Sequence, residues 1–468
     1  MSRGQTYFGD RDASLTGSSD LVAHHVFRGI QDSIKWNDRA HGIEVVVGMK
    51  GSGKTELRRY LQACTGASVY VFNLDDTHAY LDSNVSTVRG NSGRTKNAIA
   101  TVLLAEFARR ISESGSSPTR QALRSAFERT KSILQGIPGA VDINVAGVAN
   151  IRLGDLLKRE SPSDVLQSTL DDLITGISSA LSDEEKGAIL IDEVEVVFDG
   201  ISENPLFLEG VVRAVVEINA RAEEKIHVIL FIKQGLWKSW YEDQREYDRV
   251  SDRLGFITWD HPALVELIAK RIARLHGLPW GTMTSEQLWA KEFTWDGGFD
   301  KFTRYCTQYC ASGPRDMIAL CNYAAAKTPS DERISLQHIN ACLGTYSQDK
   351  VNGLNGDFGE TYRGINKFVE KVFREFPATM TSQDLVRQIE SQIASGIHGE
   401  FLDAQWYMDG TKEDLAGIAY EVGVVGYQTP ERGVYAIEDP ELSASDLLDK
   451  EWVCIHPAFR RHLRITGS

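Results

Sequence analysis

The sequence contains no long hydrophobic run, which argues against a membrane-spanning segment. Its longest run of buried character covers only residues 228–232, whereas a helix needs about 20 apolar residues to cross a bilayer. The first residues, Met-Ser-Arg-Gly-Gln, also lack the apolar core of a secretion signal. We therefore expect a cytoplasmic protein that does not associate with a membrane.

Cysteine is scarce, and the few cysteines do not form a metal-binding pattern. Only Cys306 and Cys310 lie four residues apart, and no second close pair or neighbouring histidine completes a zinc site. We expect buried free thiols instead. The six cysteines are Cys64, Cys306, Cys310, Cys321, Cys342 and Cys454.

An excess of positive charge is also lacking. The chain has 51 Lys and Arg against 65 Asp and Glu, a formal net charge of -14. The resulting field repels polyanions, so any contact with nucleic acid must be local.

The composition that remains is that of an ordinary globular protein of several domains. Apolar residues make up 42% and charged residues 25% of 468 residues, a length at which one core normally divides into two to four domains. Strand-like segments that alternate with helical ones predict an α/β fold with a parallel sheet. We divide the chain into an N-terminal strap at 1–40, an α/β core at 41–260, a helical lid at 261–348 and a winged-helix domain at 360–468.

The expected elements follow from apolar periodicity. We expect an early helix at 21–34, a β-hairpin at 141–153, and a linker at 349–359, where Gly and Asn are frequent. The strands of the α/β core are expected at 43–47, 69–72, 188–191, 226–232 and 256–259.

A glycine-rich stretch after the first expected strand fits the phosphate-binding pattern G-x-x-x-x-G-K-[ST], and it has the strand before it and the helix after it that this motif requires. Glycines let successive backbone N–H groups curve around phosphate oxygens, and the following helix directs its positive end at them. The alternative is a glycine turn with an ordinary surface lysine. The candidate nucleotide-binding residues are Gly48, Met49, Lys50, Gly51, Ser52, Gly53, Lys54, Thr55 and Glu56.

Two carboxylates end a second apolar run and complete a candidate catalytic site. We expect Lys54 to bridge the β- and γ-phosphates and Thr55 to hold Mg²⁺. Asp192 would bind the same ion, commonly through water, and Glu193 would polarise the water that attacks the γ-phosphate. Acidic residues at a strand end are often only solvated, but together the two motifs predict an ATPase that uses ATP and Mg²⁺.

These motifs, with the helical segment after them, resemble the AAA+ superfamily of P-loop ATPases. The similarity covers about residues 40–345 and points to the branch that contains origin-recognition initiator ATPases and STAND signalling ATPases. It implies a P-loop core with a parallel sheet, a helical lid and a C-terminal winged-helix domain. In this family the lid supplies a sensor 2 arginine from a Gly-x-Pro-Arg-like motif, and Arg315 after Gly313 and Pro314 matches it. A proline-started helix with a solvent-facing arginine is the alternative.

The resemblance also implies a polar sensor 1 residue after the strand at 226–232 and an arginine finger nearby. Family members usually have Asn, Ser or Thr at sensor 1, whereas this chain has Lys233 and Gln234, which leaves that role open between the two. Arg249 and Arg253 are candidate fingers, although an arginine among aspartates is often just ion-paired. A finger that acts on a neighbouring subunit's nucleotide implies a homo-oligomer.

The C-terminal domain gives mixed signals about nucleic acid. Its helix at 412–422, which would read DNA in a winged-helix domain, carries three acidic residues against one lysine, so phosphates would be repelled. A basic cluster follows at the chain end and could contact a phosphate backbone or an acidic partner, or form part of a solvated helix. Its members are Arg460, Arg461, His462 and Arg464.

Two functions therefore stay open. The first is an ATPase whose nucleotide state drives oligomerisation or remodelling, as initiator-like ATPases act on DNA. The second is a slow switch that recruits an effector protein when ATP is bound, as STAND proteins do. Bacterial relatives of this appearance are often associated with defence against phage, which makes an antiviral role a further possibility by resemblance.

Overall fold

The computed structural model divides the chain into two compact units, which we treat separately. The first unit comprises Met1–Phe27, Gly48–Leu57 and Ile257–Ser468, and the second comprises Arg28–Val47 and Arg58–Phe256. Within these units the structure describes residues 6–10, 25–26, 30, 34, 42–64, 68–73, 92–113, 117–136, 163–181, 186–192, 205–222, 225–241, 250–311, 313–359, 361–395, 404–439 and 442–467.

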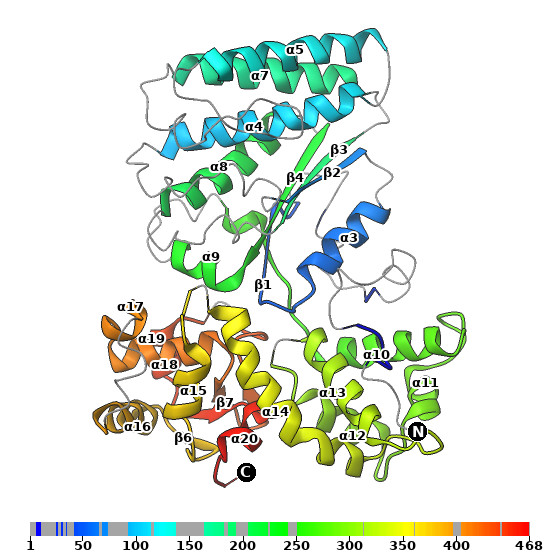
Figure 1. Ribbon diagram of the computed structural model, residues 1–468, viewed down its shortest axis with the longest axis vertical. Helices are drawn as coiled ribbons and strands as arrows, with labels where there is room; N and C mark the ends of the chain where they lie inside the picture. The colour runs from blue at the N-terminus through cyan, green and yellow to red at the C-terminus, as the bar shows by residue number, and fades with distance from the viewer. Residues whose placement is uncertain are drawn as a thin grey trace. The chain divides into compact units, whose positions relative to one another are not determined.

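A five-stranded sheet forms the centre of the second unit (Figure 1). Its strand order is β2-β3-β4-β1-β5, and the pairs β1/β5, β2/β3 and β3/β4 are parallel. All residues of β1 and β3 are buried, as expected for strands covered on both faces. The strands are β1 Val45–Gly48, β2 Ser68–Asn73, β3 Gly187–Asp192, β4 Ile226–Lys233 and β5 Leu254–Phe256. The predicted α/β class is confirmed.

Long amphipathic helices cover this sheet. Helices α4 and α8 contact each other and the strands, and α7 and α5 pack in turn on α4, so the apolar core continues from the sheet into a helical layer. Figure 1 shows α3 on the opposite side of the strands from α8. The helices are α3 Lys54–Cys64, α4 Ser92–Glu113, α5 Pro118–Gly136, α7 Ser163–Ala180, α8 Pro205–Arg221 and α9 Gln234–Tyr241.

Helices alone make up the next part of the chain, which belongs to the first unit. Asp260 caps the first of them by accepting the Ala263 N–H at 2.9 Å, and the fully buried Trp289 and Phe293 fill the centre. The ring of Phe8, near the N-terminus, stacks on Phe293 with centroids 5.5 Å apart. These helices are α10 His261–Leu275, α11 Ser285–Glu292, α12 Phe299–Thr307, α13 Pro314–Lys327 and α14 Leu336–Phe358.

The predicted linker at 349–359 is wrong, because α14 continues through almost all of it to Phe358. Each glycine costs a helix about 1 kcal/mol relative to alanine, but Val351 and Leu354 are buried and extend the apolar face of Leu343 and Tyr346. Tertiary burial of this face offsets the poor helix propensity of the segment.

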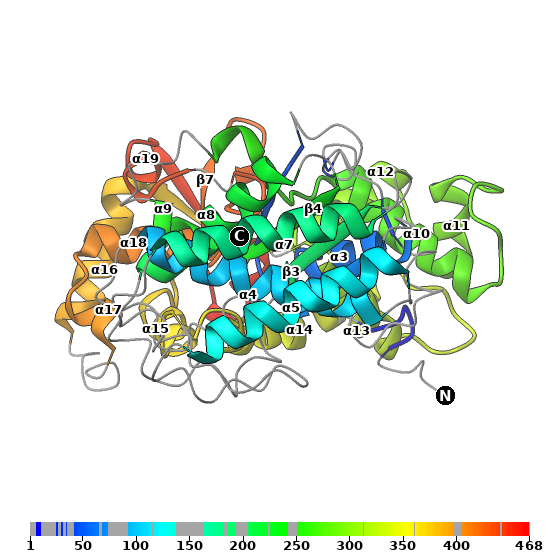
Figure 2. The ribbon, with the colours of Figure 1, turned by 90° about the horizontal axis from the view of Figure 1, so that it is seen from above.

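Helices and a small antiparallel sheet form the C-terminal part (Figure 1). The sheet order is β6-β9-β7-β8. The apolar pattern predicts strands at 424–427, 434–437 and 452–455. β7 and β9 lie at the first and the last of these, β8 shares only Val434 with the second, and β6 was not expected. The elements are α15 Ile365–Val372, β6 Thr379–Thr381, α16 Ser382–Ala394, α17 Gln405–Met408, α18 Lys412–Glu421, β7 Val425–Gln428, β8 Gly433–Val434, α19 Ala444–Leu448, β9 Trp452–Ile455 and α20 Pro457–Leu463. Figure 2 shows the ribbon from above, with α15 to α19 and β7 labelled in this part.

Several other expectations can be compared with the structure. The last core strand ends at Phe256, so Trp259 lies beyond β5 rather than inside a strand. The hairpin at 141–153 lies outside the described residues, as does most of the helix at 21–34. The five cysteines whose side chains are described are buried and free. None of the described helices is long and apolar enough to cross a membrane.

Candidate phosphate-binding loop and neighbouring sites

The glycine-rich stretch forms a tight loop between β1, which ends at Gly48, and α3, which begins at Lys54. Gly51 and Gly53 have φ angles of 86° and 99°, a backbone region that other residues rarely adopt. A Cβ atom on Gly48 would lie 2.4 Å from Ser52 Oγ. The loop therefore needs glycine at the two motif positions, Gly48 and Gly53, and also at Gly51, which occupies a variable position of the motif.

Two polar side chains of the loop are buried within its curve. The Lys54 side chain donates to the backbone oxygens of Gly48 at 2.7 Å and Met49 at 3.1 Å, and Lys54 is only 8% exposed. Ser52 is fully buried, and among the described residues no group makes a hydrogen bond to its Oγ. A buried ammonium group, an unpaired hydroxyl and a loop too tight for Cβ atoms suit a phosphate group.

Thr55 and Glu56 follow Lys54 in the first turn of α3, and both are partly exposed. The Glu56 carboxylate contacts the buried His25 ring, with 2.5 Å between Oε1 and Nδ1. Glu56, predicted to lie at the nucleotide, is thus engaged with the N-terminal segment.

Trp259 is a loop contact that the sequence did not reveal. Its indole nitrogen donates to the backbone oxygen of Ser52 at 2.7 Å, and its ring lies against Gly313, where a Cβ atom would be 2.9 Å from Cδ1. Gly313 has a φ of 87° and precedes α13. One buried indole thus connects the loop to the start of α13.

Arg315, predicted as sensor 2, lies directly against the loop. A Cβ atom on Gly51 would be 3.2 Å from Arg315 Cβ and 3.3 Å from its Nε. The Arg315 guanidinium and the Lys50 ammonium are each 3.6 Å from Oδ1 of Asp357, at the end of α14. Lys50 also donates to the backbone oxygen of Gly356. Asp357 lies in the segment expected to be a linker, so the sequence did not single it out.

Met49 connects the loop to the C-terminal part. It is buried, and its methyl group lies 3.8 Å from the position of a Cβ atom on Gly423. Gly423 has a φ of 76° and lies between α18 and β7. The variable positions of the motif, Met49 and Lys50, thus face the elements that follow α13.

In the second unit, Asp192 is the last residue of β3 and is almost fully buried. Its Oδ2 accepts from Arg58 Nε at 2.9 Å, and the two side chains are 3% and 11% exposed. Arg58 was not predicted. The sequence does hold a signal for Arg58: it follows Lys54 by four residues on α3, so the two side chains lie on the same face of that helix.

The remaining predicted residues fall into three groups. Lys233 is the half-buried last residue of β4, the strand next to β3, and the buried Gln234 begins α9 directly after it. Arg253 forms an ion pair with the buried Glu44 at 2.7 Å, the alternative considered for that arginine. Glu193 and Arg249 lie outside the described residues.

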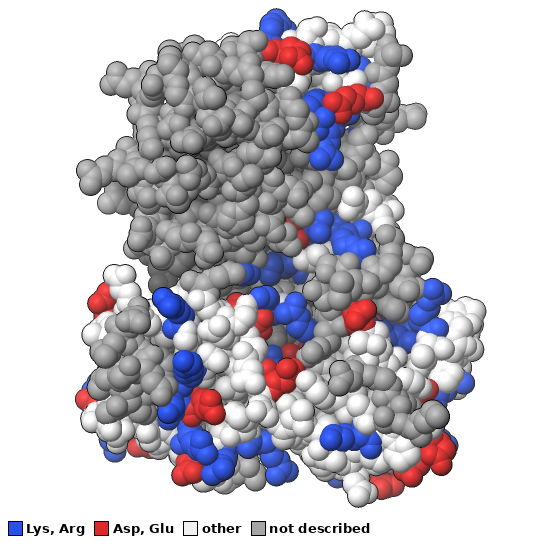
Figure 3. Space-filling view, in the orientation of Figure 1, with Lys and Arg blue, Asp and Glu red and all other residues white. Residues whose placement is uncertain are grey.

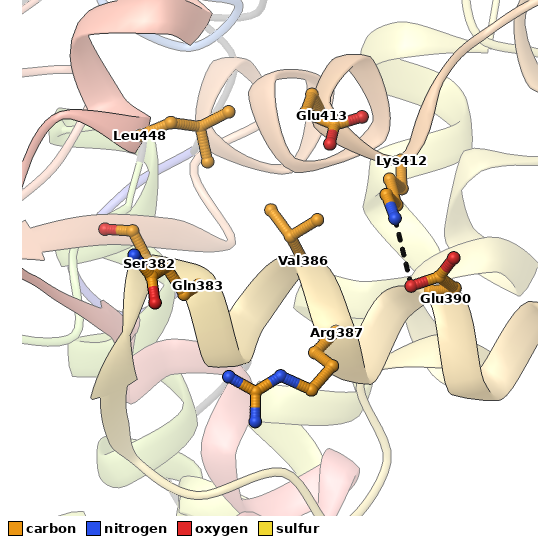
Figure 4. A pocket seen from close by; sticks show the side chains of 8 residues that line it. All are labelled: Ser382, Gln383, Val386, Arg387, Glu390, Lys412, Glu413 and Leu448. Atoms are coloured by element: carbon orange, nitrogen blue, oxygen red, sulfur yellow. Dashed lines mark ion pairs between the residues drawn. The ribbon is translucent and has the colours of Figure 1, made fainter.

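The C-terminal part contains a separate open cavity of about 430 Å³ between α16 and α18. Figure 4 shows Val386 facing it from α16, with the Lys412–Glu390 ion pair, 3.0 Å long, at one side.

On the face shown in Figure 3, basic and acidic side chains are interspersed over the C-terminal part rather than forming one basic surface. In the basic cluster, Arg460 donates to Ile455 O at 2.8 Å and His462 contacts Glu370 at 3.2 Å, so these two have internal partners.

One segment of the chain matches a known protein family. Residues 262–355, which include α10 to α13 and most of α14, match the model of a family described as the FunZ-associated C-terminal helical domain. A domain of this kind is therefore present in the chain. No curated protein matches the sequence.

Proposed function

We propose that the protein is a P-loop ATPase that binds ATP with Mg²⁺ and hydrolyses it. The observation that carries this proposal is the loop between β1 and α3, in which Gly51 and Gly53 have positive φ angles and the buried Lys54 ammonium group donates to the backbone oxygens of Gly48 and Met49. The strand order supports it as well. β4 lies between β3, which ends at Asp192, and β1, which leads into the loop, so only one strand separates the two strands that carry the motifs.

Each residue has a role that its chemistry can fill. The loop amides and Lys54 would hold the phosphates, and the Thr55 hydroxyl with the Asp192 carboxylate would hold Mg²⁺, which when bound neutralises charge that develops on the phosphates. Glu193 is proposed to orient and deprotonate the attacking water. Arg315 is proposed to read the γ-phosphate, since its stem lies along Gly51 of the loop.

Calorimetry on the 468-residue protein tests nucleotide binding. The wild type should release heat on titration with ATP and Mg²⁺, and Lys54→Met should lose this binding. Lys291→Met is the matched control, because Lys291 is an exposed lysine of α11. Absence of binding to the wild type, or equal binding to Lys54→Met, would refute the proposal.

Phosphate release tests hydrolysis separately. Glu193→Gln should bind ATP as the wild type does but should not cleave it, because an amide cannot accept the proton of the attacking water. Unchanged phosphate release by this variant would remove Glu193 from the mechanism and leave nucleotide binding intact.

A nucleotide-dependent switch with slow turnover is the second candidate, and one observation favours it. Lys50 forms an ion pair with Asp357. Met49 lies close to Gly423, and Gly51 lies close to Arg315. A change in this loop on nucleotide binding would therefore reach the C-terminal part. Particle mass and steady-state phosphate release, measured together with and without ATP, distinguish the candidates, because a switch should assemble or recruit a partner without steady turnover.

A further inference from the structure

Asp357 occupies an unfavourable position for an acidic side chain. It lies in the last turn of α14, where the helix dipole disfavours a negative charge. Its Oδ1 atom is 3.6 Å from Lys50 Nζ and 3.6 Å from Arg315 Nη1. One carboxylate oxygen is thus shared by a cation of the phosphate-binding loop and a cation of α13, and both ion pairs compensate for the unfavourable position.

A second ion pair fixes the start of α13 against the same face of α14. Asp316, beside Arg315, accepts from Lys350 at 2.8 Å, and both side chains are largely buried. Lys350 and Asp357 are seven residues apart on α14, which places them two turns apart on one helical face. The contact between Arg315 and Asp357 therefore belongs to an ordered interface between α13 and α14.

We propose that Asp357 competes with the phosphates of the nucleotide for Arg315 and Lys50. The inference rests on the proposed function, because it needs a phosphate group in the loop. On nucleotide binding, the two cations exchange the carboxylate for phosphate oxygens, and no covalent bond changes. The last turn of α14 then loses its contacts with the loop and with α13.

The competition has an energetic consequence. Breaking both ion pairs of Asp357 subtracts their free energy from the apparent binding energy of the nucleotide. The side chains are 18% exposed for Asp357 and 33% exposed for each cation, so each pair contributes a modest amount. Removal of the Asp357 charge should therefore tighten nucleotide binding rather than weaken it.

Calorimetry with Mg²⁺ and an ATP analogue that cannot be hydrolysed tests this expectation. Asp357→Asn should bind the analogue about 3- to 10-fold more tightly than the wild type, the range expected for two partly exposed ion pairs. Asp331→Asn is the matched control, because it removes an exposed carboxylate of the same helical domain and should not change the affinity. In an Arg315→Ala background, the gain from Asp357→Asn should fall below about 2-fold.

The outcomes separate this inference from the proposed function. If the wild type does not bind the analogue, the proposed function fails and this inference fails with it. If the wild type binds and Asp357→Asn binds equally or more weakly, competition is refuted while nucleotide binding stands.

A second measurement does not depend on a variant that folds. Hydrogen exchange at residues 351–359 of the wild type should become faster when the analogue binds, because the last turn of α14 is released. Slower or unchanged exchange would overturn the inference.

Discussion

The buried ion pair between Arg58 and Asp192 allows a quantitative test of the second unit. Replacing Arg58 by Met keeps most of the aliphatic stem and removes the guanidinium group, so the buried Asp192 carboxylate loses this cation. Breaking a buried pair in this way typically costs about 3–5 kcal/mol. We expect a loss near 3 kcal/mol in the free energy of unfolding, because the Arg58 side chain keeps 11% exposure.

Urea denaturation followed by circular dichroism at pH 7 measures this loss, and hydrogen exchange at residues 186–192 shows whether it falls on β3. The double variant Arg58→Met/Asp192→Asn should be more stable than the sum of the single losses predicts, because an amide is easier to bury than a carboxylate. Arg304→Met is the control, since Arg304 pairs with Asp300 on the surface, where both side chains are more than 60% exposed. It should leave the free energy of unfolding nearly unchanged, because exposed ion pairs contribute little.

Two results would refute the reasoning about this pair. A loss below about 1 kcal/mol for Arg58→Met would mean that the Asp192 carboxylate does not depend on that cation. Strictly additive losses in the double variant would mean that the two side chains are not coupled.

Three further predictions concern the loop and the C-terminal part. Gly48→Ala should destabilise the protein by about 1–3 kcal/mol in urea, because the new Cβ atom would lie 2.4 Å from Ser52 Oγ; adding Ser52→Ala should recover part of the loss, and no recovery would contradict the proposed clash. Trp259→Phe removes the hydrogen bond to Ser52 O and part of a buried ring. It should weaken ATP binding several-fold in calorimetry and also lower the thermal stability, whereas unchanged affinity would show that the indole does not hold the loop. Burial lowers the pKa of His456 well below its usual 6.5, and Lys350 and Arg460 lower it further. Below about pH 6.5 the folded state then binds fewer protons than the unfolded state. The free energy of unfolding should therefore decrease as the pH is lowered, by up to about 1.4 kcal/mol per pH unit. His456→Asn, which can still cap α20, should reduce this slope between pH 6.5 and 5, and an unchanged slope would exclude His456 as its source.

The sequence by itself determined the local features of the candidate loop. The glycine-rich motif identified Gly51, Gly53 and Lys54 and predicted a helix after the loop; the structure shows the positive φ angles that suit the two glycines and begins the helix at Lys54. The α/β class followed from the pattern of apolar residues: short continuous apolar runs predict buried parallel strands, and the segments between them have the apolar period of a helix.

Tertiary contacts decided what local patterns cannot express. Asn and Gly residues after Lys350 predict a linker, but burial of Val351 and Leu354 continues α14 and brings Asp357 to Lys50 and Arg315. Periodicity identifies which face of an element is buried, but not what that face meets.

The partners of the loop illustrate the same limit over longer distances in the chain. Trp259 lies 207 residues after Ser52, and Arg58 lies 134 residues before Asp192. The sequence specifies such pairs only through the complete fold, because each contact depends on how several elements pack together. The sequence therefore determined the chemistry of the candidate loop, whereas the tertiary structure decided which side chains hold it.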